Sequence, residues 1–211
     1  VDIFSAKLLT MHRWVLIGGA GLTGLNIAEK LIGMNISKCN IVIADLKACL
    51  HRIHLPVTLL ECDISKNIMP TFMQDDIIVH LAARQYHAEI PKRNQLDWFR
   101  KVNLTGTKNV IDHCIKYNVK GLIFFSTDMV YGVPNYTPLT ATHSKRPIGP
   151  YGKSKLEAEQ LCIKSRNRGL NITILRPRLI MGKGRLGIME NLFKAISLNI
   201  PIPLIGNGKN Y

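Results

Sequence analysis

Short apolar runs alternate with longer amphipathic segments along most of this chain. The apolar runs are rich in Ile, Val, Leu and Phe, and they lie at residues 14–17, 41–44, 57–60, 77–81, 122–125 and 172–175. Runs that are apolar on both faces are typical of parallel strands covered by helices on both sides. The pattern therefore predicts six buried strands.

Helical periodicity occupies the intervals between several of these runs. In residues 22–32, Leu22, Leu25, Ala28 and Leu31 recur at the spacing of one helix face. Residues 96–117 and 151–168 are also predicted to be helical. Strands that alternate with helices imply right-handed crossovers, and so an α/β fold: a doubly wound parallel sheet, the Rossmann fold, with helices on both faces.

The pattern changes after Arg176-Pro177. Gly182, Gly184 and Gly187 indicate a loop, and a helix is predicted over residues 188–198. Residues 200–208 are predicted to be extended or turn-like, because proline disfavours a helix. We expect an NAD-binding Rossmann domain over residues 11–180. Residues 181–211 are expected to begin a truncated C-terminal region that binds substrate.

A glycine-rich loop joins the first predicted strand to the first predicted helix. It reads GGAGLTG over residues 18–24, with Gly18, Gly21 and Gly24 at regular spacing. Glycine lets the chain turn tightly and lets phosphate oxygens approach the backbone. The helix that follows directs free N–H groups and its positive end at a pyrophosphate. The motif therefore predicts a dinucleotide site.

The end of the second strand bears on which dinucleotide is bound. Asp45 lies 21 residues after Gly24, where a carboxylate would bond the ribose hydroxyls and repel a 2′-phosphate. This favours NAD. Lys47 and Arg52 keep NADP open as the less favoured cofactor.

Two further strand ends carry candidate cofactor contacts. In the sequence CDI, Asp63 is placed either to approach the adenine amine or to cap the following helix, and both roles remain open. In the sequence HLAA, the small Ala82 and Ala83 would let the chain pass close to a cofactor. The alternative is an ordinary strand end with small residues.

The sequence YGKSK supplies candidate redox chemistry. Tyr151 and Lys155 are four residues apart and share a face of the predicted helix. A neighbouring ammonium favours the phenolate and draws the pKa of a tyrosine toward working pH. Ser126 and Thr127 end a buried strand, at the edge where ligands of open α/β sheets bind. Together these residues predict hydride-transfer chemistry.

These motifs resemble those of extended short-chain dehydrogenases/reductases of the NAD-dependent epimerase/dehydratase family. The matching sequences are GGAGLTG, the strand-end Asp45, CDI, HLAA, VNLTGT, STDMVYG, YGKSKLEAE, LRP and PIPLIGNGKN. The resemblance implies that Tyr151 is the catalytic base and that Lys155 is the family's catalytic lysine. It also implies that the hydroxyl of Thr127 forms a hydrogen bond with the substrate oxygen. In an epimerase, hydride then returns to the other face of the keto intermediate.

The resemblance also implies a set of cofactor contacts and a mode of assembly. The contacts fall on Gly18, Gly21, Leu22, Thr23, Gly24, Asp45, Asp63, Ile64, Leu81, Ala82, Ala83, Asn103, Tyr151, Lys155 and Pro177. Asn103 occupies the position of an asparagine that supports the active site. A homodimer through the helices at 96–117 and 151–168 is expected by the same analogy.

Two departures from the family pattern narrow the expected substrate and reaction. Met129 stands where dehydratases have a glutamate, so elimination of water is disfavoured. Leu179 stands near the place of an asparagine that contacts the substrate diphosphate. Arg178 and Arg185 are candidate replacements for that contact through charge, with simple solvent exposure as the alternative.

Composition limits the choice of partners. The net charge is +14, and residues 160–189 hold seven cations and no acid, which favours an anionic small-molecule substrate. Low aromatic content and the lack of a nucleic-acid module argue against DNA or RNA. Five dispersed cysteines show no metal-ligand spacing and suit a reducing cytoplasm. No apolar run is long enough to span a membrane.

The sequence thus predicts an NAD-dependent epimerase or related oxidoreductase that acts on a nucleotide sugar. Met129 and Leu179 favour an alternative, an alcohol dehydrogenase or ketoreductase with a non-nucleotide substrate. A third reading is a protein that binds NAD without catalysis.

Overall fold

The computed structural model describes residues 12–86, 89–182 and 189–201. The chain divides into two compact units, residues 1–178 and residues 179–211. The division lies two residues before the predicted boundary. The assignment of these units to cofactor and substrate stays a prediction.

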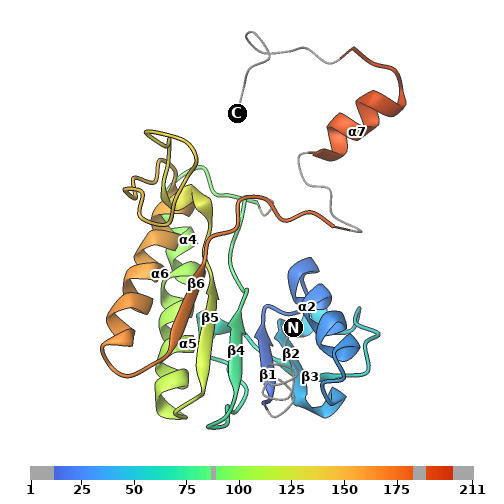
Figure 1. The fold of residues 1–211 in the computed structure, drawn as a ribbon, viewed down its shortest axis with the longest axis vertical. Coiled ribbons are helices and arrows are strands. Elements are labelled where there is room, and N and C mark those ends of the chain that lie inside the picture. The colour runs from blue at the N-terminus through green and yellow to red at the C-terminus, as the bar shows by residue number, and fades with distance from the viewer. Residues whose placement is uncertain (1–11, 87–88, 183–188, 202–211) are drawn as a thin grey trace. The chain divides into compact units, whose positions relative to one another are not determined.

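One six-stranded parallel sheet forms the centre of the first unit. Its strands are β1 (Trp14–Ile17), β2 (Ile41–Asp45), β3 (Thr58–Glu61), β4 (Ile77–His80), β5 (Gly121–Phe125) and β6 (Ile172–Leu175). They lie in the order β3-β2-β1-β4-β5-β6, and every neighbouring pair is parallel (Figure 1). The predicted Rossmann fold is confirmed. Because the order reverses between β1 and β4, ligands are expected at the carboxyl ends of these two strands.

Helices connect the strands. They are α2 (Leu22–Gly33), α3 (Lys47–Leu50), α4 (Gln95–Asn103), α5 (Thr105–Lys116) and α6 (Pro150–Arg166), with short 3-10 turns η1 (Lys38–Asn40), η2 (Ile64–Lys66) and η3 (Asp128–Val130). In the second unit, α7 (Met189–Ser197) matches the helix predicted there. None of the helices among the described residues has the length and apolar character that crossing a bilayer requires.

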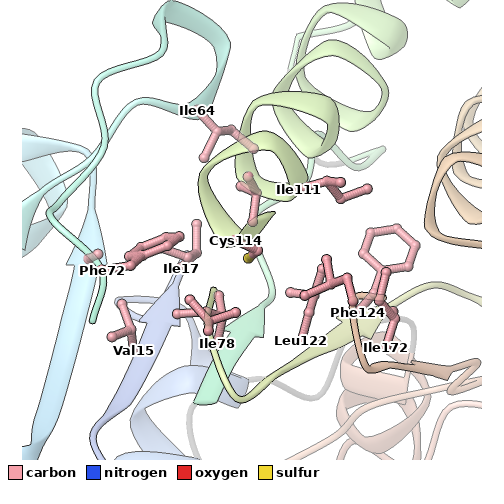
Figure 2. Close-up of a cluster of buried hydrophobic side chains, with 14 of the residues drawn as sticks. Val15, Ile17, Ile64, Phe72, Ile78, Ile111, Cys114, Leu122, Phe124 and Ile172 are labelled. Atoms are coloured by element: carbon pink, nitrogen blue, oxygen red, sulfur yellow. The ribbon is translucent and has the colours of Figure 1, made fainter. Parts of the chain in front are cut away.

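The core has two layers, one on each face of the sheet. Val15 and Ile17 of β1 belong to a cluster that includes Ile111 and Cys114 of α5 (Figure 2). Cys162 of α6 belongs to the same cluster. Leu16, between Val15 and Ile17, joins the cluster on the opposite face, which includes Leu31 of α2. Successive residues of a strand point to opposite faces, so a strand that is apolar throughout is buried on both sides.

The single helix predicted over residues 96–117 is wrong in one respect, because two helices, α4 and α5, meet at Leu104. The hydroxyl of Thr107 donates to the carbonyl oxygen of Asn103 at 2.7 Å. A side-chain donor inserted into the helical hydrogen-bond ladder is a known cause of bends. The segment predicted to be extended over 200–208 falls largely outside the described residues.

Close packing of α2 on the preceding loop explains one glycine of the loop motif. A Cβ atom at Gly24 would lie 2.4 Å from both Cα and the carbonyl oxygen of Gly19. Because this contact is with backbone, it cannot be relieved by a side-chain rotation. The start of α2 therefore rests directly on the loop.

We predict that Gly24→Ala lowers the free energy of unfolding by about 1–3 kcal/mol, since α2 must move away from Gly19. Urea denaturation without any cofactor measures this change. The matched control is Gly33→Ala at the other end of α2, where a Cβ has nothing within 4 Å. The control is expected to stay within about 1 kcal/mol of the wild type. Equal effects of the two substitutions would contradict the packing argument.

Candidate active site

The glycine loop lies against the end of β4. Gly18 has a φ of 79°, a conformation that favours glycine, and its N–H donates to the carbonyl oxygen of Ala44 at 2.8 Å. A Cβ at Gly18 would lie 2.4 Å from the backbone nitrogen of Ala82. Leu81 and Ala82 both donate to the carbonyl oxygen of Ile17. The loop and the HLAA segment therefore meet where the strand order reverses.

Gly21 differs from the other two glycines of the motif. It is exposed, and a Cβ there would meet only the carbonyl oxygen of Gly18, at 3.6 Å. Packing within the chain therefore does not require glycine at this position. The open space fits a group that approaches the loop from outside, such as a pyrophosphate.

The amino end of α2 also fits an anion. Gly21 is its N-cap and provides no side-chain cap, and the first turn contains no acidic residue. The first N–H groups of a helix have no partners within the helix. Contacts of the N–H groups of Leu22, Thr23 and Gly24 with phosphate oxygens stay predictions, which this geometry supports.

Asp45 is fixed beside this loop. Its Oδ2 accepts from the N–H of Ala20 at 2.9 Å, and its Oδ1 accepts from the N–H of Leu46 at 2.7 Å. The carboxylate at the end of β2 therefore lies next to the loop residue that precedes Gly21. Each carboxylate oxygen still has acceptor capacity for a ribose hydroxyl.

Asp63 caps η2, which was one of the two roles considered for it. Its side chain accepts from the N–H and the hydroxyl of Ser65, at 3.0 and 2.7 Å. These bonds lower the pKa of Asp63, with a smaller effect of Lys66. The Ile64 side chain is buried in the core, where it faces Gly106. Contacts of Asp63 and Ile64 with a cofactor stay predictions.

Tyr151 and Lys155 are both buried on the first turns of α6. Lys155 Nζ donates to the carbonyl oxygen of Phe125 at 2.6 Å and lies 4.2 Å from the ring centroid of Phe124. Burial lowers the pKa of Lys155 from its ordinary value of 10.5 to about 8, although Cys162 and Glu159 act in the other direction. A cation at this position is thus held at the carboxyl end of β5.

Thr127 lies two residues beyond the carbonyl group that holds Lys155. It is buried, and it N-caps η3 by accepting from the N–H of Met129 at 3.3 Å. Its hydroxyl lies 3.3 Å from Oδ1 of Asp128, to which it donates. Both contacts are long for hydrogen bonds that involve a hydroxyl. The hydroxyl is therefore able to exchange them for a substrate oxygen.

Asn103 links three segments around the candidate base. Its side-chain carbonyl accepts from the N–H of Arg84 at 2.8 Å, while its amide donates to the carbonyl of Arg84 and to the hydroxyl of Ser154. Ser154 in turn donates to the carbonyl oxygen of Tyr151 at 2.7 Å. Asn103 therefore connects the segment after β4 with the first turn of α6.

His80 extends the same buried network and was not singled out from the sequence. Its Nε2 lies 2.9 Å from Oγ1 of Thr107, whose proton goes to the Asn103 carbonyl, so Nε2–H is the donor. Burial, with a contribution from Lys155, lowers the pKa of His80 to about 3. The imidazole is therefore neutral. The available signal was the place of His80 itself, which opens the HLAA sequence and is the last residue of β4.

Two arginines of the basic segment over residues 160–189 are engaged in internal contacts. Arg176 forms a bidentate ion pair with the buried Glu159 and donates to the hydroxyl of Tyr131. Arg166 donates to the carbonyl of Ile172. Arg178 is 82% exposed, with Nε 3.8 Å from Asp128.

The remaining predicted residues are placed as follows. The carbonyl of Pro177 accepts from the N–H of Asp128 at 3.2 Å, which joins the LRP segment to η3. Ala83 follows Ala82 and is partly exposed. Arg185 lies outside the described residues. Within the part of the chain that the structure describes, no cluster of side chains is suited to hold a metal ion.

Comparisons with known proteins agree with this geometry. The model of the NAD dependent epimerase/dehydratase family matches residues 14–211. The UDP-glucose 4-epimerase of Vibrio cholerae is 27% identical over 196 residues, which cover 90% of this chain and 58% of that protein. The 3beta-hydroxysteroid-dehydrogenase/decarboxylase isoform 2 of Arabidopsis thaliana is 32% identical over 149 residues, which cover 68% of this chain and 25% of that protein.

Among solved structures, the UDP-glucuronic acid 4-epimerase of Bacillus cereus in complex with NAD has a similar fold. The TM-score is 0.71 at 22% identity, and the match covers 92% of this chain and 66% of that chain. The chain thus spans less than two thirds of each of these three proteins.

The burial of Lys155 predicts a distinct pH dependence of stability. Between about pH 8 and pH 10.5 the unfolded state binds more protons at this lysine than the folded state, so its contribution to stability rises with pH. Lys155→Met removes that contribution. The free energy of unfolding of the wild type minus that of the variant should rise across this window, on the order of 1–3 kcal/mol. Urea denaturation at several pH values measures the difference, and a flat difference would contradict the burial of a titrating ammonium.

Proposed function

Because the chain belongs to the NAD dependent epimerase/dehydratase family, we propose that it is part of an NAD-dependent epimerase that acts on a nucleotide sugar. The observation that carries the proposal is the attachment of α6 at the carboxyl end of β5, where Lys155 binds the carbonyl oxygen of Phe125. Tyr151 and Lys155 come from α6, and Thr127 follows the strand. The glycine loop lies at the switch point of the same sheet edge.

The residues divide the chemistry among them. When bound, NAD would supply a nicotinamide able to accept a hydride from a sugar carbon and give it back. Tyr151 removes the proton of the substrate hydroxyl, and Thr127 donates a hydrogen bond to the same oxygen. Lys155, one turn after Tyr151 on α6 and fixed on the carbonyl of Phe125, supplies the cation that favours the phenolate form of Tyr151.

The substrate class rests on the relatives and on one side chain. The Vibrio and Bacillus proteins are named as 4-epimerases of UDP sugars. Met129 lies two residues after Thr127 and is 41% exposed. Its side chain has no exchangeable proton for the elimination of water. Epimerisation is therefore favoured over dehydration. Assembly as a homodimer and an anionic substrate belong to the same proposal.

A second candidate function is a dehydrogenase for a non-nucleotide alcohol. The Arabidopsis relative is named as a hydroxysteroid dehydrogenase, and Leu179 is 47% exposed at the start of the second unit. Titration with UDP separates the two functions, because only the epimerase requires a site for a nucleotide diphosphate. NAD binding without turnover of any alcohol or UDP sugar would instead favour the non-catalytic reading.

We predict that Tyr151→Phe lowers the rate of interconversion of UDP-glucose and UDP-galactose by about 10²–10⁴-fold, because the proton acceptor is lost. The ring remains, so NAD content should be unchanged. Chromatography of the products and extraction of the cofactor measure the two quantities.

Tyr117→Phe is the matched control, since Tyr117 lies at the other end of the fold, after α5. It should retain activity. Full activity of Tyr151→Phe would overturn the proposed mechanism. Failure of the wild type to interconvert or bind any UDP sugar would overturn the substrate class.

Asp45→Asn should shift the cofactor preference toward NADP. The amide keeps one acceptor, for the N–H of Ala20, gives up the bond from the N–H of Leu46, and removes the negative charge that opposes a 2′-phosphate. The ratio of the NADP to the NAD dissociation constant is expected to fall by about 10-fold, which corresponds to about 1.4 kcal/mol. Glu61→Gln, at the paired position on β3, is the control and should leave the ratio nearly unchanged. An unaltered ratio in Asp45→Asn would exclude this role.

A further inference from the structure

The segment after β4 is held firmly at Arg84. Asn103 binds both its N–H and its carbonyl group, as described above. The guanidinium of Arg84 donates to the carbonyl oxygen of Trp98 at 2.6 Å and lies 4.4 Å from the centroid of the Trp98 ring. Backbone and side chain are thus both anchored on α4. The position of Tyr86, two residues later, is constrained accordingly.

Tyr86 is the outer member of an aromatic cluster that contains the candidate base. Its ring centroid lies 5.6 Å from that of Tyr151 and 5.5 Å from that of Phe99, in edge-to-face geometry. Phe99 also contacts Tyr151, at 5.7 Å. Phe99 is fully buried and Tyr151 is 7% exposed, whereas Tyr86 is 46% exposed. Tyr86 therefore presents an accessible aromatic surface directly beside Tyr151.

The start of α6 leaves room for the Tyr86 hydroxyl. A Cβ at Gly149, the N-cap of α6, would lie 2.7 Å from Oη of Tyr86. Ser, Thr, Asp and Asn are preferred at an N-cap because their side chains bond the first N–H groups. Glycine gives up that bond and leaves room for the phenol. The packing thus places a hydroxyl at the amino end of the helix that carries Tyr151.

We propose that Tyr86 contacts the glycosyl group of the substrate and helps to set which sugar is accepted. This inference rests on the proposed function. A sugar whose hydroxyl reaches Tyr151 lies next to the Tyr86 ring, which offers an apolar surface and one hydroxyl. Binding sites commonly combine aromatic walls with a few placed polar groups. Tyr86, whose ring contacts Phe99 and Tyr151 edge-to-face, offers a large aromatic surface of this kind.

Steady-state kinetics of the protein with UDP-glucose and UDP-N-acetylglucosamine test this assignment. In Tyr86→Ala, the ratio of kcat/KM for the two substrates should change by about 10-fold or more, because the wall next to the sugar is removed. Tyr86→Phe keeps the ring and should show a smaller change in that ratio. The NAD content of both variants should equal that of the wild type, since the ring lies beside the sugar rather than the glycine loop.

Ile163→Ala is the control, because Ile163 is 44% exposed on the same helix as Tyr151 but three turns away. Ile163→Ala should leave the ratio unchanged.

If Tyr86→Ala and Tyr86→Phe keep the wild-type ratio while the wild type turns over UDP sugars, the role assigned to Tyr86 is wrong and the proposed function stands. If the wild type neither binds nor converts UDP sugars, both are wrong. Should Tyr86→Ala fail to fold, the ratio in Tyr86→Phe and in Tyr86→Leu decides, and wild-type ratios in both overturn the assignment.

Discussion

The bond from the buried ammonium of Lys155 to the carbonyl of Phe125 fixes α6 on the sheet, and the geometry of the candidate site depends on it. Lys155 is 2% exposed, and its partner lies at the last residue of β5. A buried charge is costly unless it is bonded, so this contact favours the placement of α6 that keeps it. Tyr151, one turn earlier, is positioned with it.

Polar groups buried around this contact serve the same purpose. Asn103 joins the segment after β4 to Ser154 on α6, and Thr107 joins Asn103 to His80 at the end of β4. Each bond satisfies a group that would otherwise be buried without a partner. The end of β4, the segment after it and the helix that carries the candidate base are therefore tied together through side chains.

Much of the fold was predictable because apolar strands and amphipathic helices follow from the periodicity of the sequence. The strands were placed to within one residue, since short runs apolar on both faces fit only a covered parallel sheet. The break at Leu104 was not predicted. It depends on the hydroxyl of Thr107 and on the anchoring of Asn103 at Arg84, which periodicity does not reveal.

The sequence by itself determined how strands and helices alternate along the chain, because each element has its own local periodicity. It also determined the glycine loop and the pair formed by Tyr151 and Lys155, because the spacing within each motif is local. Tertiary structure alone decided that Arg176 binds Glu159, that Asp45 binds the glycine loop, and that Tyr86 lies on Tyr151. These partners are distant along the chain. Their contacts arise only when the packed sheet brings strand ends and helix starts to one edge, so no local pattern records them.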